Sequence, residues 1–254
     1  MEGFPRGAGC DRDGHSVPGD SIVSETLVSI ARMCRRNQFS PGRTLNIMRF
    51  SSIEDALEAL AAGRVIIVAD SEERENEGDF VAAAEKVTAE SVNFMITEGR
   101  GQLCLPVVPQ IARRLDLVPM VPDADLSMPC FTIPIDHGLC RTGISPTERA
   151  FTIQRAVDVA AVPEEFVRPG HVFPLIAREG GVLEGSGHTE TAVDLMEMAG
   201  LSPAAVLCEI CSRDGKNMAD GPELMELAEH WQMPIITVDE VIRCRQRAAV
   251  AVRQ

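Results

Sequence analysis

The chain has 254 residues, 45% of them hydrophobic and 24% charged, with a formal net charge of −14 at pH 7. This composition suits one globular domain, and no apolar run reaches membrane-spanning length, so no membrane partner is expected. The negative charge repels the phosphates of nucleic acid, which excludes that partner, and an anionic ligand would need local arginines or bound metal ions. The first residues carry no signal-peptide pattern, so a cytoplasmic location is expected.

Residues 1–47 differ in composition from the rest of the chain. They mix Gly, Pro, Arg, Asp and Ser without sustained periodicity, apart from a short helical pattern at residues 24–35. This mixed composition without periodicity predicts a disordered N-terminal tail. Residues 48–254 show no repeat or linker, so a single domain is expected there. The eight cysteines lack the dense spacing of a disulfide scaffold and favour free thiols.

From Ser51 onward the local signals alternate between helix and strand. Ser51 and Glu54 predict a capping box for a helix that ends at Gly63. The apolar run Val65–Ala69 predicts a buried strand. Further strands are predicted at 80–84 and 102–105, with a helix at 88–97 between them.

The second half of the chain continues this alternation. Ser145, Pro146 and Glu148 together make a strong helix start, for a helix that runs to about Val159. Pro134 demands an edge or an irregularity in the strand predicted at 131–135. Other strands are predicted at 172–176, 205–211 and 235–238, and helices at 189–199, 222–231 and 239–247. The pattern predicts an α+β fold, layered as in α/β proteins, with a mixed sheet flanked by helices.

An acidic loop, residues 70–79, follows the strand Val65–Ala69 directly. It gathers six carboxylates around Arg74. These groups repel one another unless a cation lies among them, and oxygen ligands suit Mg²⁺, which takes one or two carboxylates plus waters and substrate oxygens. The alternative is a solvated acidic turn. The position at the end of a strand favours the site, since ligands bind there in α/β sheets.

A glycine-rich turn precedes the helix predicted to begin near His188. Backbone N–H groups at a helix start favour anions, and Gly185 and Gly187 let a ligand approach the main chain closely, so a phosphate fits there. The alternative is that His188 and Thr189 simply cap the helix.

Two further residues are weak candidates when taken alone. His171 follows Arg168-Pro169-Gly170 and is by itself a turn residue more often than a catalyst. Glu209 is a carboxylate in an otherwise apolar strand, so it is either buried, with a raised pKa useful for proton transfer, or on the polar face of that strand.

The motifs become specific in combination. In order along the chain they are Arg74-Glu75-Asn76-Glu77-Gly78-Asp79, the segment 101–105 around Cys104, Thr142-Gly143-Ile144-Ser145 with Glu148-Arg149, the segment 168–175, Gly187-His188-Thr189-Glu190 and Leu207-Cys208-Glu209. Together they closely resemble 3,4-dihydroxy-2-butanone 4-phosphate synthase of riboflavin biosynthesis. The resemblance covers residues 50–245, and with no GTP cyclohydrolase II domain downstream the single-function form is expected.

The resemblance implies a lyase that converts D-ribulose 5-phosphate into 3,4-dihydroxy-2-butanone 4-phosphate and formate. It implies Mg²⁺ or Mn²⁺, two ions per site, no organic cofactor, and a homodimer with its site near the subunit boundary. Glu75 and His188 would be the metal ligands, and His171 and Glu209 the catalytic residues. Substrate contacts would be Arg74, Glu75, Asp79, Gly185, Ser186, Gly187, His188, Thr189 and Glu209, and pocket-lining positions Cys104, Asp70, Thr142 and Arg149.

One position departs from the family pattern, because the usual arginine two residues before Gly-His-Thr is Gly185 here. A charge-assisted hydrogen bond to phosphate is worth ~1.5–3 kcal/mol, so substrate binding is expected to weaken about ten- to a hundredfold. Arg141, Arg149 or Arg178 could supply the charge instead. Gly185→Arg is expected to lower KM. The alternatives are a non-catalytic or weakened paralogue, and another divalent-metal sugar-phosphate isomerase or aldolase, neither of which releases formate.

Overall fold

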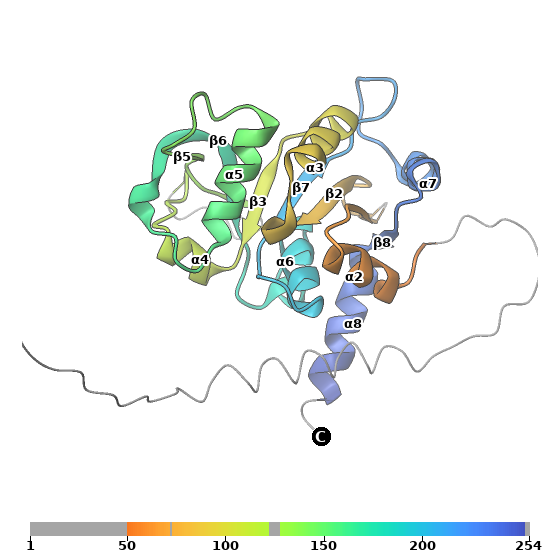
Figure 1. Cartoon of the computed structure of the whole chain (residues 1–254). Coiled ribbons are helices and arrows are strands. Elements are labelled where there is room, and N and C mark those ends of the chain that lie inside the picture. The colour runs from red at the N-terminus through yellow and green to blue at the C-terminus, as the bar shows by residue number, and fades with distance from the viewer. Residues whose placement is uncertain (1–49, 72, 122–127, 252–254) are drawn as a thin grey trace, which may run out of the picture.

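The computed structural model describes residues 50–71, 73–121 and 128–251 (Figure 1). The predicted tail, 1–47, and its helical pattern at 24–35 lie outside these residues. In the part of the chain that is described, no helix combines the length and apolar character needed to cross a membrane.

A mixed eight-stranded sheet forms the centre of the domain, in the order β4-β6-β3-β7-β2-β1-β8, with β5 paired to β6. The β1–β8 and β3–β6 pairs are parallel, whereas β2 is antiparallel to β1 and β7. The predicted mixed sheet is therefore confirmed. The strands are β1 (Ile66–Ala69), β2 (Gly78–Ala83), β3 (Cys104–Val107), β4 (Cys130–Phe131), β5 (Ile135–His137), β6 (Phe166–Ile176), β7 (Ala205–Glu209) and β8 (Ile235–Thr237).

Helices cover both faces of this sheet. They are α2 (Ile53–Ala61), α3 (Ala89–Phe94), α4 (Pro109–Arg114), α5 (Pro146–Val157), α6 (His188–Met198), α7 (Gly221–Trp231) and α8 (Val238–Ala251). Alternate strand residues point to opposite faces, so Ile66 and Val81 pack with α2, α6 and α8, while Ile67 and Phe80 pack with α3, α4, α5 and α7. Figure 1 shows α6 and α3 on opposite sides of the sheet.

The start of α2 corrects one prediction. Its N-cap is Ser52, whose Oγ accepts a hydrogen bond from the Asp55 backbone N–H at 3.1 Å, so the capping box predicted at Ser51 is wrong by one residue. Ser51 instead pairs with β8: its N–H donates to the Ile235 carbonyl at 2.7 Å, and its Oγ accepts from the Ile235 N–H at 3.2 Å. Ser51 therefore forms hydrogen bonds with the last strand and does not cap α2.

Other elements follow the local signals more closely. Ser145 Oγ accepts from the Glu148 N–H at 3.2 Å, as predicted for the start of α5. The strand predicted at 131–135 is interrupted at Pro134 into β4 and β5, both of which pair with β6. The helix predicted at 88–97 continues beyond α3 as a wider turn, Met95–Gly99. The short helix α4 was not predicted.

Candidate active site

The acidic loop and the glycine turn, far apart in the sequence, line a single cavity of about 610 Å³. The loop contributes Arg74, Glu75, Glu77 and Asp79, and the turn contributes residues 185–190 at the start of α6. Glu209, at the end of β7, also lines the cavity. The structure therefore brings together every substrate-binding and metal-ligating residue that the sequence predicted.

Arg74 joins the two segments. Its Nη1 lies 2.6 Å from Asp70 Oδ2, and its Nη2 lies 3.0 Å from Glu75 Oε1. A Cβ built on Gly187 would lie 3.6 Å from the same Nη2. The guanidinium thus lies beside the glycine turn, while Asp70 and Glu75 hold it in place.

Asp79 is the most deeply buried carboxylate of the cavity, with 3% of its surface exposed. The register of β2 and β7 places it directly opposite Glu209. Burial raises the pKa of Asp79 to about 6; the facing His188 opposes this shift, and Glu209, Glu77 and Glu75 add to it. Burial, followed by the charge of Glu75, also raises the pKa of Glu77. This cluster is stabilised by a proton or by a cation.

Glu209 is half-buried at the end of β7, between the fully buried and the solvent-facing positions that its sequence left open. Its Oε2 accepts a hydrogen bond from the Gln102 backbone N–H at 2.7 Å. A Cβ on Gly101 would lie 2.6 Å from that same oxygen, so only glycine allows the segment at 101 to approach Glu209 this closely. The carboxylate is held by backbone on one side and faces the cavity on the other.

His188 is the first residue of α6, and the N-cap is Gly187. No side chain caps this helix, so the alternative that His188 and Thr189 serve as caps is wrong. The His188 side chain is 9% exposed, and its Nδ1 lies 4.0 Å from Asp79 Oδ2. Its Nε2 is buried with no hydrogen-bond partner among the described residues. An unpartnered imidazole nitrogen beside carboxylates is what a metal ligand requires.

The donor set fits a hard divalent cation held by few protein ligands. Glu75 offers a carboxylate that is half exposed to the cavity, and His188 offers its unpartnered nitrogen. Within the described ranges, no group of three or more His, Cys, Asp or Glu side chains is arranged to hold a metal by itself. Mg²⁺ commonly keeps several waters and takes its remaining ligands from the substrate, so two protein ligands are sufficient.

His171 lies apart from this cavity, on β6, and is not among its lining residues. Its Nδ1 lies 2.7 Å from Asp136 Oδ2, and its backbone N–H donates to Asp136 Oδ1 at 2.9 Å. The imidazole is 44% exposed, whereas Asp136 is buried. Sequence reasoning missed Asp136; the available signal was a carboxylate that directly follows the predicted strand 131–135.

The four positions implied as pocket-lining do not line the cavity in the described structure. Cys104 lies in the core, where burial raises the pKa of its thiol. Asp70 holds Arg74, and the Thr142 hydroxyl donates to Glu148 at 3.0 Å. Of Arg141, Arg149 and Arg178, only Arg178 lines the cavity.

A mixed layered sheet thus carries an acidic loop that faces a glycine turn at a helix start, a class of site whose donor groups suit a divalent cation and an anion. The family model of 3,4-dihydroxy-2-butanone 4-phosphate synthase matches residues 54–244, and the chain belongs to that family.

Curated relatives agree with this membership. The riboflavin biosynthesis protein RibBA of Bacillus subtilis (strain 168) is 52% identical over 206 residues, which are 81% of this chain and 52% of that protein. RibBA of Bacillus velezensis is 53% identical over the same shares of both chains. The chain thus spans about half the length of the curated relatives that it matches.

Solved structures show the same fold. RibBX from A. baumannii, a two-domain 3,4-dihydroxy-2-butanone 4-phosphate synthase, has a TM-score of 0.74 at 42% identity, over 77% of this chain and 58% of its own. A 3,4-dihydroxy-2-butanone 4-phosphate synthase in complex with two magnesium ions has a TM-score of 0.73 at 36% identity, over 78% of this chain and 98% of its own.

Proposed function

We propose that this chain converts D-ribulose 5-phosphate into 3,4-dihydroxy-2-butanone 4-phosphate and formate, as a lyase of riboflavin biosynthesis that depends on Mg²⁺ or Mn²⁺. The single observation that carries the proposal is the meeting of Glu75 and His188 in one cavity, with the His188 Nε2 unpartnered. Family membership and the magnesium ions of the relative described above support it.

Each side of the cavity has a separate task in this proposal. Glu75 and His188 would hold the metal, which would supply Lewis-acid polarisation of the substrate oxygens. Arg74 and Asp79 orient the sugar hydroxyls at the acidic side. The turn 185–189 receives the phosphate, since α6 has no side-chain cap and its first backbone N–H groups face an incoming anion.

Proton transfer requires a base and an acid. Removal of the proton next to the ketone carbonyl leaves negative charge on the substrate oxygens, and the later bond rearrangement needs a proton returned. Glu209, held by the Gln102 N–H, has a free face toward the cavity. His171, oriented through Nδ1 by Asp136, presents its other nitrogen for transfer.

His171 reaches the chemistry in our proposal because the protein is a homodimer, so that the imidazole of one copy completes the cavity of the other. Around β5, β6 and α5 the surface is apolar: Leu139 is 79% exposed, and Ile144 and Val167 are each 52% exposed. Such a patch is typical of a surface covered by a partner. The half-exposed His171 lies among the same elements.

Formate release is the direct test of the activity. Purified protein with ribulose 5-phosphate and Mg²⁺ is expected to release formate, and a chelator is expected to abolish the release until Mg²⁺ or Mn²⁺ is restored. Sugar-phosphate isomerases and aldolases consume the same substrate class without forming formate. Substrate loss with no formate would therefore refute the proposed reaction, and turnover unaffected by the chelator would refute the metal dependence.

Complementation tests the shared site. His171→Asn and Glu209→Gln are each expected to be inactive alone. After the two variants are unfolded together and refolded, random pairing in a dimer leaves one intact site in half the dimers, so activity should return to about a quarter of the wild-type value. A mixture with no recovered activity, in a preparation that sedimentation shows to be dimeric, would place His171 and Glu209 of the same copy in one site.

The non-catalytic alternative depends on Gly185 alone, and every other proposed site residue is present. We also propose a cytoplasmic location. It is supported by the free thiols of Cys104, Cys130, Cys140, Cys208 and Cys211, which are expected in a reducing compartment.

A further inference from the structure

The cavity is strongly negative for a site that receives a sugar phosphate. Its lining includes two arginines, one histidine and six carboxylates, namely Glu75, Glu77, Asp79, Glu184, Glu190 and Glu209. A phosphate carries up to two negative charges and is repelled by such a wall unless a cation faces it. A metal held on the acidic side serves the reacting oxygens, so the phosphate end needs a cation of its own.

Of the two arginines lining the cavity, Arg74 is already engaged. Both of its Nη atoms contact carboxylates, Asp70 at 2.6 Å and Glu75 at 3.0 Å. Arg178 is different, because its Nη1 donates only to the Glu184 carbonyl at 2.8 Å and its Nη2 has no acceptor among the described residues. Its Nε lies 4.0 Å from Glu190 Oε1, beyond hydrogen-bond distance.

The position of Arg178 is fixed by both ends of the glycine turn. Its backbone N–H donates to Glu190 Oε1 at 3.2 Å, in the first turn of α6, and its carbonyl accepts from the Gly181 N–H at 3.0 Å. With the bond from Nη1 to Glu184, these contacts hold the guanidinium against the turn while its side chain keeps 31% exposure. A donor that is fixed in this way loses little entropy when an anion binds.

Gly185 provides the space for this guanidinium. A Cβ at Gly185 would lie 3.0 Å from both the Cδ and the Nη1 of Arg178, and 3.1 Å from its Cζ. These distances are at the limit for a Cβ atom, so a larger residue at 185 would displace the arginine. The absence of a side chain at Gly185 therefore leaves room for the Arg178 guanidinium.

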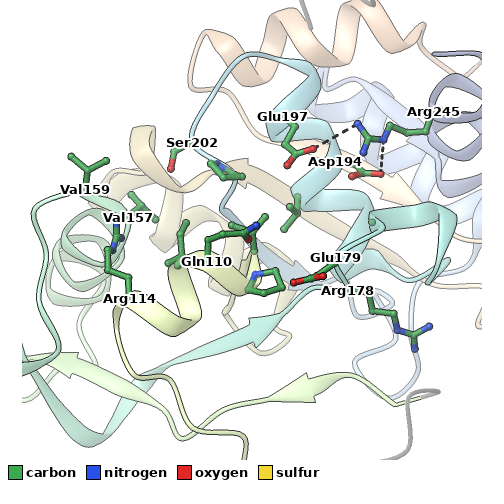
Figure 2. Close-up of a pocket in the computed structure, with 16 residues that line it drawn as sticks. Gln110, Arg114, Val157, Val159, Arg178, Glu179, Asp194, Glu197, Ser202 and Arg245 are labelled. Atoms are coloured by element: carbon green, nitrogen blue, oxygen red, sulfur yellow. Dashed lines mark ion pairs between the residues drawn. The ribbon is translucent and has the colours of Figure 1, made fainter. Parts of the chain in front are cut away.

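A second pocket, of about 280 Å³, borders Arg178 on its other side (Figure 2). Figure 2 shows the Arg178 side chain running away from that pocket, in which Asp194 and Glu197 both pair with Arg245. The guanidinium therefore belongs to the glycine turn.

We propose that Arg178 is the phosphate-binding cation of this chain, in the space that Gly185 leaves open. This inference rests on the proposed sugar-phosphate function. It also changes one expectation: Gly185→Arg alone should not lower KM, because Arg178 already occupies the space that the new side chain would enter.

The test compares four variants of the full chain in the presence of Mg²⁺. Arg178→Ala is expected to raise KM for ribulose 5-phosphate, and Kd for inorganic phosphate by calorimetry, about ten- to a hundredfold, with a smaller change in kcat. Arg178→Ala combined with Gly185→Arg should recover most of both losses, because the arginine introduced at 185 supplies the positive charge that Arg178→Ala removes. Gly185→Arg alone should show no gain. Arg213→Ala, an exposed arginine that pairs with Glu226, is the matched control and should match wild type.

Two results would overturn the assignment: Arg178→Ala with KM and phosphate affinity within about twofold of wild type, or a double variant no better than Arg178→Ala. Should Arg178→Ala fold poorly, Arg178→Gln keeps a donor for the Glu184 carbonyl and gives the same comparison. Absence of formate from wild type would refute the proposed activity, while the phosphate calorimetry would still decide the role of Arg178.

Discussion

His171 and Asp136 form a pair joined twice: Asp136 Oδ2 lies 2.7 Å from His171 Nδ1, and Asp136 Oδ1 accepts from the His171 backbone N–H at 2.9 Å. The carboxylate is buried and the imidazole is half exposed. A carboxylate at this distance fixes the plane of the ring and favours the tautomer with its proton on Nδ1, so that Nε2 would be the atom that exchanges protons in the proposed reaction. We consider Asp136 a positioning residue.

Asp136→Asn tests that role. An amide can present a second donor to Nδ1 and reverse the tautomer, so kcat should fall about 10²- to 10³-fold while KM changes little. The pH profile of kcat should shift as well, which a purely structural defect would not cause. Asp55→Asn, at the exposed start of α2, is the control. An unchanged kcat in Asp136→Asn would exclude the role.

The position of Asp136 in the His171–Asp136 pair also requires a glycine at 143. Its φ is +76°, and a Cβ there would overlap the Asp136 carboxylate. Gly143→Ala should therefore lower kcat by displacing Asp136, and its effect should not add to that of Asp136→Asn. Gly200→Ala is a matched control, since Gly200 has φ +72° with nothing near its Cβ, and it should cost only about 1 kcal/mol of backbone strain. Equal activity in both variants would contradict the collision.

Metal binding can be measured without turnover. Glu75→Gln and His188→Gln should each weaken Mn²⁺ binding at least about tenfold, observed by electron paramagnetic resonance of the free ion. Glu164→Gln, at an exposed glutamate outside the cavity, should bind as wild type does. Unaltered Mn²⁺ affinity in both site variants would remove them as ligands.

Asp194 predicts a pH dependence of stability. Burial raises its pKa to about 6, although Arg245 Nε lies 3.2 Å from Asp194 Oδ2 and the Val182 N–H donates to the same oxygen at 3.1 Å. The folded protein then holds this proton more tightly than the unfolded chain, where the pKa is 3.8. The contribution of this group to the free energy of unfolding is therefore full below pH 4 and declines as pH rises to 6, by on the order of 3 kcal/mol.

Arg245→Ala should make that decline larger. Without the guanidinium the charged form of Asp194 is less favourable, so the variant should lose more stability at pH 8 than at pH 5, where Asp194 is mostly protonated. Urea unfolding at the two pH values measures the difference. Arg213→Ala, with its exposed pair, should show little change at either pH. An equal loss for Arg245→Ala at both values would count against the titration of Asp194.

Local sequence signals predicted much of the fold, because caps, apolar runs and prolines act within a few residues. Ser145 caps α5, and Pro134 interrupts the strand in which it lies. The misplaced start of α2 has a tertiary cause: Ser51 is not the N-cap because β8, distant in the sequence, offers it a backbone partner. Rules based on neighbouring residues cannot include a hydrogen-bond partner that comes close only when the chain folds.

The candidate site divides in the same way. The sequence by itself determined which chemical groups are available: the carboxylates of the acidic loop, His188 and the glycines around it. Together these groups indicated a metal and a phosphate. Only the tertiary structure decided which groups meet: it placed Arg178 against Gly185, paired Asp136 with His171, and left His171 outside the cavity. The reason is that contacts between segments far apart in the chain depend on strand order and register, and those are set by the packing of the whole sheet.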